Sequence, residues 1–376
     1  MILRFYPSRD ATIYESDPER NTGLDPILQI TKLPATSSTS GAYTSSFNSR
    51  ILIDFDYPAI SSSITNLGYN HTSASYHLKL YATEASEISL NYSLEAFPIS
   101  GSWNMGVGKA NTQPATTEGV SWYYLQSKLP PSASWLTSSF AAGSTGSWHV
   151  NPGGGNWYTA SVNPVPTQTF NYTTTDVDLD ISPIVHAIQS GSIEFTGIIV
   201  KKTDAFESGT STIKALNFYS KDTGTIYSPV IEARVDDGEW SGALTASVID
   251  MTSSAEPNIL CTNLRPSYKE GARPLIRFAG RFRYPAGFST QSLFVNTHPL
   301  PSGSHYAIKD AASDDFIINF DSTYTKISTN NDGSFIKLHL DSFQPERYYR
   351  LLVKVPYPDG YSDDIFDDDW IFKVER

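Results

Sequence analysis

Apolar and polar residues alternate over short stretches along most of the chain, and turn-forming residues separate these stretches. In the stretch RILIDF, for example, Ile51, Ile53 and Phe55 fall on one side of an extended backbone. A period of two residues predicts a strand that buries one face and exposes the other to water. In the first 235 residues this pattern predicts strands at 11–15, 26–32, 49–57, 75–83, 88–99, 196–202, 215–221 and 228–235.

One segment, SPIVHAIQSG, has instead the pattern of a short helix. Ser182 is expected at the N-cap, Pro183 at the first helical position and Gly191 directly after the end. No second histidine or cysteine lies at metal-ligand spacing from His186, so we interpret His186 as a surface or half-buried residue of this helix.

Residues 100–170 differ from the strands around them, because they are rich in Gly, Ser, Thr and Trp. A loop of this length stays ordered only if it buries side chains of its own, so one interpretation pins it to the sandwich through its aromatic rings. The alternative leaves the rings exposed in a groove, where they would stack on sugars or contact a protein partner. The tryptophans for either role are Trp103, Trp122, Trp148 and Trp157, and Trp135 lies in the same segment.

A polar stretch, DDGEWSGAL at 236–244, follows these strands and marks a domain boundary. The remaining residues contain about eight further strand patterns, a spacing typical of an antiparallel sandwich of immunoglobulin-like size. We therefore predict an all-β protein with two domains. A jelly-roll β-sandwich with the insertion at 100–170 and one short helix covers 1–235, and an Ig-like β-sandwich covers 245–376. The later strands are predicted at 245–251, 274–284, 292–298, 305–310, 315–321, 335–341, 347–355 and 368–376.

The chain carries 39 acidic against 27 basic side chains, a formal net charge of −12. DNA or an anionic membrane surface would be repelled, so we expect neither nucleic acid nor a membrane as a partner. No apolar run approaches the roughly 20 residues that span a bilayer. The first residues, MILRFYPSRDATIY, also lack the apolar segment of a secretory signal, so we expect no export by that route.

The residue patterns of common catalytic sites do not occur in the sequence. The single cysteine, Cys261, excludes an intrachain disulfide and a thiolate cluster. There is no Gly-x-Ser-x-Gly elbow, phosphate-binding glycine loop or His-Glu-x-x-His pair. The carboxylates gather in turns, where solvent is expected to keep them unperturbed. We therefore expect a non-enzymatic protein without a cofactor.

Two stretches gather hard oxygen ligands of the kind that Ca²⁺ accepts, although neither has the EF-hand spacing. In the first, Asp10, Asn21 and Asp25 are the candidates for a structural cation site. The alternative, which we favour, is that these side chains brace the turn between two strands by accepting hydrogen bonds from backbone N–H groups. The second stretch, DGYSDDIFDDDW at 359–370, is interpreted as a solvated acidic loop rather than a site.

Five segments of the first 235 residues follow one another in a set order: RDATIYESDPERNTGLDPILQI, SRILIDFDYPAI, YHLKLYAT, VDLDISPIVHAIQSGSIEFTGIIVKK and LNFYSKDTGTIYSPVIEARV. In these segments the chain resembles the jelly-roll, carbohydrate-binding-like modules called DNRLRE or disaggregatase-related domains. It departs from that family in the middle, where a single Trp-containing loop is replaced by the long insertion. Similar modules followed by an Ig-like half occur in virion proteins of tailed phages.

The resemblance implies a virion structural protein of a tailed bacteriophage, in the neck, tail or baseplate or decorating the head. Such a protein contacts other virion proteins and copies of itself, and it needs no signal because virions assemble in the host cytoplasm. The alternative that the resemblance leaves open is a glycan-binding module for attachment to a host or surface polysaccharide.

Overall fold

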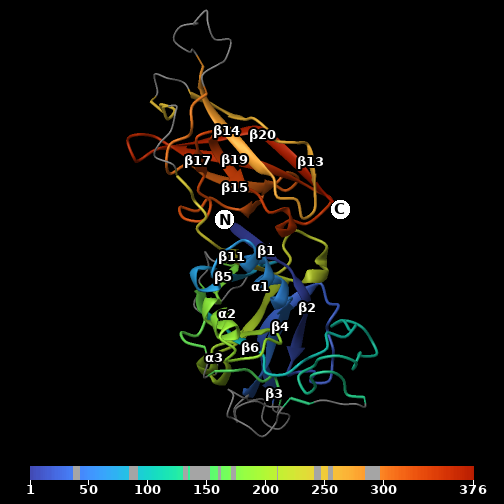
Figure 1. The fold of residues 1–376 in the computed structure, drawn as a ribbon. Coiled ribbons are helices and arrows are strands. Elements are labelled where there is room, and N and C mark those ends of the chain that lie inside the picture. The colour runs from blue at the N-terminus through green and yellow to red at the C-terminus, as the bar shows by residue number, and fades with distance from the viewer. Residues whose placement is uncertain are drawn as a thin grey trace, which may run out of the picture. The chain divides into compact units, whose positions relative to one another are not determined.

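The structure is a computed structural model of the full chain, and it is all-β, as predicted from the sequence. Strands make up 44% of it and helices 10%. None of the helices in the part of the chain that the structure describes is long and apolar enough to cross a membrane. Figure 1 shows the elements in chain order. The structure describes residues 1–36, 43–83, 92–129, 134–135, 153–159, 162–170, 175–209, 211–240, 247–252, 257–283 and 297–376.

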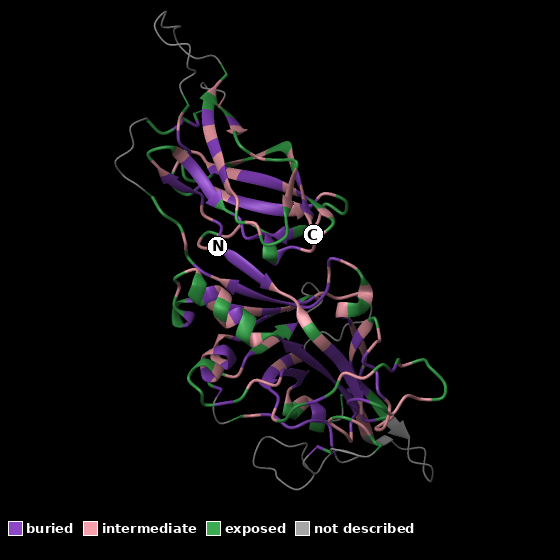
Figure 2. Ribbon diagram, turned by 45° about the vertical axis from the view of Figure 1, so that its right-hand side comes forward, coloured by how far each residue is buried: buried purple, intermediate pink, exposed green. Residues whose placement is uncertain are grey.

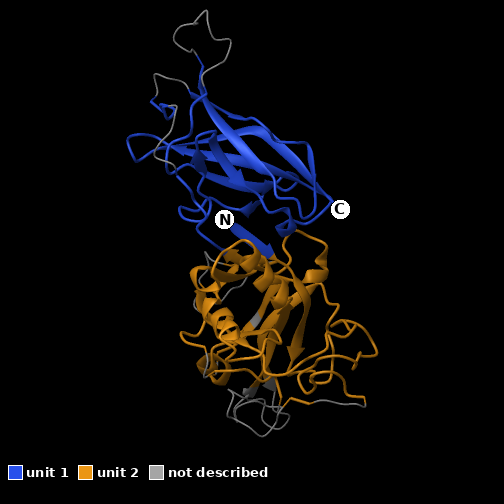
Figure 3. Ribbon diagram, viewed as in Figure 1, with its two compact units in different colours: residues 1–4, 234–376 blue, residues 5–233 orange. Residues whose placement is uncertain are grey.

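The chain divides into two compact units, shown in Figure 3. Unit 2 is residues 5–233, and unit 1 combines residues 1–4 with residues 234–376. The sequence placed the first four residues with the N-terminal domain. They group with unit 1 because Met1 and Val235 exchange backbone hydrogen bonds, with the Met1 amino group donating at 2.6 Å and the Val235 N–H at 2.9 Å.

Unit 2 contains a large sheet of seven strands, and its central strands are buried on both faces. Ile51, Leu52 and Ile53 of β4 are all fully buried although they alternate in direction. The prediction that these strands show one face to water is therefore wrong, and Figure 2 shows their burial. The order is β10 (Ile213–Tyr219), β3 (Ile27–Thr36), β4 (Tyr43–Phe55), β9 (Ile198–Lys202), β6 (Tyr92–Pro98) and β7 (Thr167–Phe170), with β2 (Pro7–Tyr14) also paired to β4.

A smaller sheet of unit 2 supplies further buried apolar side chains. In its strand β5, Tyr76, Leu78 and Leu80 are fully buried while the residues between them are half-buried. This strand therefore has the one-sided burial that its sequence predicts. The sheet contains β11 (Val230–Arg234), β5 (Ser75–Leu80) and β8 (Val177–Asp180) in that order, and β1 (Ile2–Phe5) spans the division between the units.

The described residues of unit 2 contain three α-helices, where the sequence analysis predicted one. The unpredicted α1 (Tyr57–Asn66) begins where the Asp56 carboxylate accepts from the Ala59 N–H at 3.1 Å. The predicted helix is α2 (Ser182–Gln189), in which Ser182 is the first helical residue rather than the N-cap. Short helical segments complete the description: α3 (Asp204–Ser208), η1 (His71–Ser73), η3 (Lys221–Thr223) and, in unit 1, η4 (Leu340–Ser342).

Unit 1 is a β-sandwich of a four-stranded and a five-stranded sheet. The rings of Phe278 and Trp370, one from each sheet, lie 5.9 Å apart. One sheet has the order β12 (Pro257–Cys261), β14 (Leu275–Phe282), β18 (Gly333–Lys337) and β17 (Ser328–Asn330). The other has the order β13 (Ser267–Lys269), β20 (Asp363–Glu375), β19 (Arg347–Pro356), β15 (His305–Asp310) and β16 (Phe316–Ile318).

Several predicted segments of unit 1 differ from the structure. Residues 247–251 of the strand expected at 245–251 are not in a strand, and most of 292–298 lies outside the described residues. The acidic stretch at 359–370 is not one loop, because β20 begins at Asp363 and only the residues before it form the turn. Its aspartates therefore lie mostly on a strand.

Candidate functional site

The strand register places cationic and apolar side chains on one face of the large sheet, which we call the covered face. Leu52 of β4 is paired with Ile199 of β9. Because side chains two residues apart share a face, Arg50 lies on the side of Leu52 and Lys201 on the side of Ile199. The covered face therefore carries two cations among apolar side chains, and the structure buries both of them.

Four tryptophans of the insertion are packed over the covered face. The indole N–H of Trp103 donates to the Thr196 carbonyl at 2.8 Å, and that of Trp135 donates to the Ser121 carbonyl at 2.9 Å. Their polar ends are thus paired inside the protein, as buried indoles require. The cluster contains Trp103, Trp122, Trp135 and Trp157, each at most 2% exposed, with Ala11, Ile13, Leu52, Phe97, Ile99, Val120 and Ile199.

The buried rings correct the interpretation that leaves them exposed for sugars or for a protein partner. The faces of Trp122 and Trp157 are occupied by the Arg50 guanidinium, 5.0 and 5.1 Å from the ring centroids. Arg9 lies over Trp103 at 4.7 Å. Trp148, the fourth predicted ring, lies outside the described residues. The other interpretation, in which the insertion is pinned by its own aromatics, agrees with the burial of Trp103, Trp122 and Trp157.

Arg50 and Glu207 form a buried, two-bonded ion pair beneath the insertion. The guanidinium donates to the two carboxylate oxygens at 3.2 and 2.5 Å, and a third N–H donates to the Gly154 carbonyl at 2.5 Å. Burial alone would raise the pKa of Glu207, but Arg50 and the neighbouring lysines outweigh it and lower this pKa to about 2. The pair therefore joins β4, α3 and the insertion in one charged contact.

Lys201 makes a second charged contact on the same face. Its ammonium donates to the Asp204 carboxylate at 2.5 Å and to the Lys202 carbonyl at 2.9 Å, and Glu95 lies 3.7 Å away. The ammonium also lies 5.4 Å from the ring centroid of Trp157. The cation is thus neutralised by the start of α3 and by β6.

Two further lysines are buried nearby and are held by backbone carbonyls. Lys202 donates to the Thr31 carbonyl. Lys32 donates to the carbonyls of Phe206 and Gly209, both at 2.5 Å. Burial is the main cause that lowers the pKa of Lys202 to about 7, with Glu207 opposing it. Burial also lowers the pKa of Lys32.

The contacts described above form one charge cluster that holds neighbouring segments together. It consists of Lys32, Arg50, Lys201, Lys202 and Glu207. Each of the four cations has a carboxylate or carbonyl acceptor, and α3 supplies acceptors to Lys32, Arg50 and Lys201. The sequence analysis did not single out these residues. The available signal was the presence of charges inside apolar strands, in RILIDF and IIVKK, where a buried cation must be paired.

Asn21, one of the three cation candidates, holds the start of the insertion. Its amide N–H groups donate to the Met105 and Val120 carbonyls at 2.7 and 2.8 Å, and its side-chain oxygen accepts from the Gly108 N–H at 2.7 Å. The side chain therefore braces backbone, as expected, but most of that backbone belongs to the insertion rather than to its own turn.

Glycines surround Asn21 because the backbone approaches it closely. A Cβ at Gly108 would lie 2.2 Å from the Asn21 carbonyl oxygen, and one at Gly119 would lie 2.5 Å from its amide nitrogen. Gly119 also has a φ of +108°, which favours glycine. Asn21, the first residue of the Asn21-Thr22-Gly23 motif, thus packs against glycines that lie far away in the sequence.

Asp10 and Asp25 also accept from backbone N–H groups, Asp10 from Lys221 at 2.7 Å and Asp25 from Ala110 at 2.9 Å. The other oxygen of Asp10 is buried without a hydrogen-bond partner among the described residues. Burial raises the pKa of Asp10 to about 7, so solvent does not keep this carboxylate unperturbed. No group of three or more His, Cys, Asp and Glu side chains in the described ranges could hold a metal ion.

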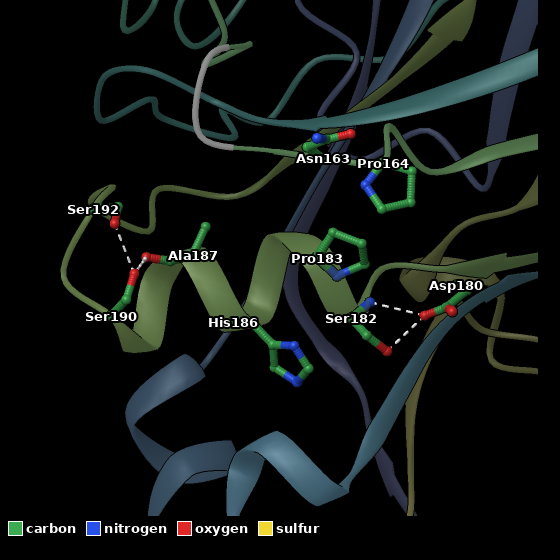
Figure 4. A pocket seen from close by; sticks show the side chains of 9 residues that line it. All are labelled: Asn163, Pro164, Asp180, Ser182, Pro183, His186, Ala187, Ser190 and Ser192. Carbon is green, nitrogen blue, oxygen red and sulfur yellow. Dashed lines mark hydrogen bonds between the residues drawn. The ribbon is translucent and has the colours of Figure 1, made fainter.

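A cavity of about 550 Å³ lies beside α2 and is shown in Figure 4. None of its three serine hydroxyls is hydrogen-bonded to the ring of its histidine, and the Ser190 hydroxyl contacts the Ala187 carbonyl and the Ser192 hydroxyl. The Ser182 hydroxyl donates to Asp180 at 2.6 Å, and Nε2 of His186 donates to the His71 carbonyl at 3.1 Å. Figure 4 shows the His186 ring on the side of α2 away from Asn163. These contacts order the start of the helix and leave no pair for acyl transfer in this cavity.

No protein-family model matches the chain, and no curated protein matches it. Among solved structures, it is similar to a DUF4785 family protein from Legionella pneumophila with a TM-score of 0.18 and 7% sequence identity. That match covers 100% of this chain, and the chain spans 62% of the length of that protein.

Proposed function

We propose that this chain is a non-enzymatic structural protein of a tailed-bacteriophage virion, placed in the neck, tail or baseplate or on the head. It contacts neighbouring subunits through its two β-rich units, and it joins the particle during assembly in the host cytoplasm. The resemblance of residues 1–235 to modules of such virion proteins supports the phage assignment. The observation that carries the structural role is the closure of the covered face by the insertion.

A ligand or substrate needs a concave site with unengaged polar groups. On the covered face the rings of Trp122 and Trp157 contact Arg50, and the cations are matched by Glu207, Asp204 and backbone carbonyls. Groups engaged in this way stiffen the sandwich. A stiff body that presents outer surfaces suits assembly, because little order has to be gained on binding.

The phage assignment is tested on particles. Mass spectrometry of virions purified from the host that carries this sequence should detect the chain in a fixed ratio to the other virion proteins. Electron microscopy of those virions with an antibody to the chain should then label one location. Detection of the chain only in the particle-free lysate would contradict the proposal.

Three of the four rings on which the glycan-binding alternative depended, Trp103, Trp122 and Trp157, are buried. Titration with soluble polysaccharides should leave the tryptophan fluorescence unchanged, because Trp103, Trp122 and Trp157 are already in contact with protein. A saturable change in fluorescence that disappears when Trp122 is replaced by phenylalanine would restore the alternative.

A further inference from the structure

The five-stranded sheet of unit 1 has an outward face with an unusual residue pattern, which we call the open face. Along β19, Tyr349, Leu351, Val353 and Val355 are buried on the inner side. Arg350, Leu352 and Lys354 point to the opposite side, where the two cations are partly exposed and Leu352 is buried. The register places Ile371 opposite Arg350 and Ile365 opposite Lys354, so these isoleucines lie on the open face. Phe316 of β16 is paired with Lys309 of β15, which is in turn opposite Arg350.

Large apolar side chains lie exposed on three strands of this face, β16, β19 and β20. Phe316 is 42% exposed, Tyr348 is 55%, Ile365 is 56% and Ile371 is 40%. A solvent-facing sheet surface is ordinarily polar, and single exposed apolar residues need no explanation. Four of them on three strands of one face form a patch of the kind that marks a protein contact.

The charges of the open face have both signs and alternate with the apolar side chains. Lys354 lies 3.4 Å from Asp363, Lys373 lies 2.6 Å from Glu346, and Arg350 contacts Asp314 and, at 3.5 Å, Asp367. Lys309, Arg350 and Lys354 lie along β15 and β19, and the carboxylates of Asp363 and Asp367 lie on β20, which also contains Lys373. Such a surface is complementary to a second copy of itself. A twofold rotation can bring the cations of one copy over the carboxylates of the other.

The edge of this sheet is a poorer docking site than its face. β13 pairs only with Lys373–Glu375 of β20. The first part of β20 pairs with β19 along one edge, and its other edge has no partner among the described strands. That part contains Asp367, Asp368 and Asp369, where the register with β19 is interrupted and Asp369 has a φ of +52°. A bulge with inserted charges is a known protection of a strand edge against pairing.

We propose that the open face is the contact between two copies of this chain, which pack sheet on sheet around a twofold axis. The inference rests on the proposed function and deepens it by naming one partner and its surface. The five strands have 3, 13, 10, 6 and 3 residues, 35 in all. At about 3.3 Å per residue and about 4.8 Å between strands, they give a flat area of roughly 550 Å² per copy. Two copies would bury roughly 1,100 Å², the size of a weak, reversible interface.

A second copy fits this face better than a partner of one charge sign. A strongly basic partner would meet Lys309, Arg350, Lys354 and Lys373, and a strongly acidic partner would meet the aspartates of β20. In either case like charges would face one another in a partly desolvated contact, which is unfavourable. Weak, transient complexes lie at this small end of interface size, so we expect a dimer that forms in a concentration-dependent way at micromolar concentrations.

The test is sedimentation equilibrium of the full chain over a range of micromolar concentrations. The wild type should shift from monomer to dimer, and the double variant Ile365→Asp/Ile371→Asp should weaken the dimer about tenfold or more. Leu129→Asp is the matched control, because Leu129 is 54% exposed but lies in unit 2, and it should leave the dimer unchanged.

Tyr348→Ser provides a second variant that adds no charge, and it should also weaken the dimer. Circular dichroism should show that all variants keep the wild-type fold. A wild type that stays monomeric throughout, or a dimer that resists both open-face variants, would overturn the inference. A dimer that forms as expected from a chain that is missing from virions would refute the phage assignment and leave the contact standing.

Discussion

Two sheet faces in this chain carry cations beside large apolar side chains, but only one of them is closed. The covered face in unit 2 has Arg50 and Lys201 beneath the insertion, whereas the open face in unit 1 has Arg350 and Lys354 beside exposed isoleucines. The strands alone do not distinguish the two faces. The difference comes from a segment elsewhere in the chain that brings its own aromatic rings and carbonyls to one face.

The comparison also separates two kinds of ion pair. The Arg50–Glu207 pair is almost fully buried, so the loss of either partner leaves an uncompensated charge in a medium of low dielectric constant. The pairs of the open face are partly exposed, and solvent screens them. Buried pairs hold the insertion in unit 2, and screened pairs on the open face remain able to exchange partners.

The largest effect is expected from Glu207→Gln, which removes the carboxylate and leaves Arg50 and the buried lysines without it. We expect a loss of about 3–5 kcal/mol in the free energy of unfolding of unit 2, measured by urea denaturation with tryptophan fluorescence. Asp332→Asn is the control. It breaks a pair with Arg277 in which Asp332 is 74% exposed, and it should cost no more than about 1 kcal/mol. Equal effects of the two variants would mean that water reaches the covered face.

The next effect is the pH dependence caused by Asp10. Its pKa is about 7 in the folded protein against an ordinary 3.8, so the folded state holds the proton more tightly. The corresponding stability is complete below the ordinary pKa and is lost as the pH rises through the interval to about 7. Asp10→Asn should remove this loss. The variant should therefore gain on the wild type by on the order of 3 kcal/mol between acid and neutral pH.

The measurement for Asp10→Asn is urea denaturation of both proteins at several pH values. The asparagine oxygen keeps the acceptor for the Lys221 N–H, so the structure should be retained. Asp176→Asn, at an exposed carboxylate that accepts from the Ala82 N–H, serves as the matched control and should show no such trend. If the free energies of unfolding of the wild type and Asp10→Asn differ by the same amount at every pH, folding does not raise the pKa of Asp10.

A smaller effect is expected from Asn21→Ala, which leaves the Met105 and Val120 carbonyls and the Gly108 N–H without their partner. We expect a loss of about 2–3 kcal/mol and faster proteolysis near residues 105–120. Asn70→Ala is the control. Asn70 caps the exposed η1 by accepting from the Thr72 N–H, and its loss should cost about 1 kcal/mol without a change in proteolysis there. Unchanged cleavage in Asn21→Ala would mean that the tryptophans alone hold the insertion.

The smallest effect is expected from Ile371→Ser on the open face. The side chain is 40% exposed, so its removal should change the free energy of unfolding of the monomer by less than about 1 kcal/mol. Thermal unfolding in dilute solution measures this, with Leu129→Ser as a matched exposed variant. A loss of several kcal/mol would mean that the face is already covered within one chain.

The all-β architecture was predictable because strand periodicity is local. β5 follows the alternation of its sequence, and the short α2 follows from its proline and terminal glycine. α1 was missed because Ile60 and Ile64 are its only buried positions and serines and a threonine make up half of its other residues. Such a pattern lacks the apolar stripe by which a helix is recognised.

The candidate site was predictable only in part. The aromatic rings and Asn21 were recognised as residues with a role, but their partners lie far away in the sequence. No local pattern states that Trp122 covers Arg50, or that Gly108 and Gly119 meet Asn21. The sequence before Lys202 has the same limit. Its apolar run predicts the strand β9 but does not indicate which face of that strand another segment covers.

The contact around Asn21 has a consequence for how this chain tolerates change. The asparagine binds main-chain atoms, so the identity of most side chains between 109 and 117 has little influence on the anchor. Residues 111–114 are exposed at the far end of that segment. A foreign peptide grafted there would be displayed from a fixed base, and natural variants could diversify this tip while conserving the glycines that make the base.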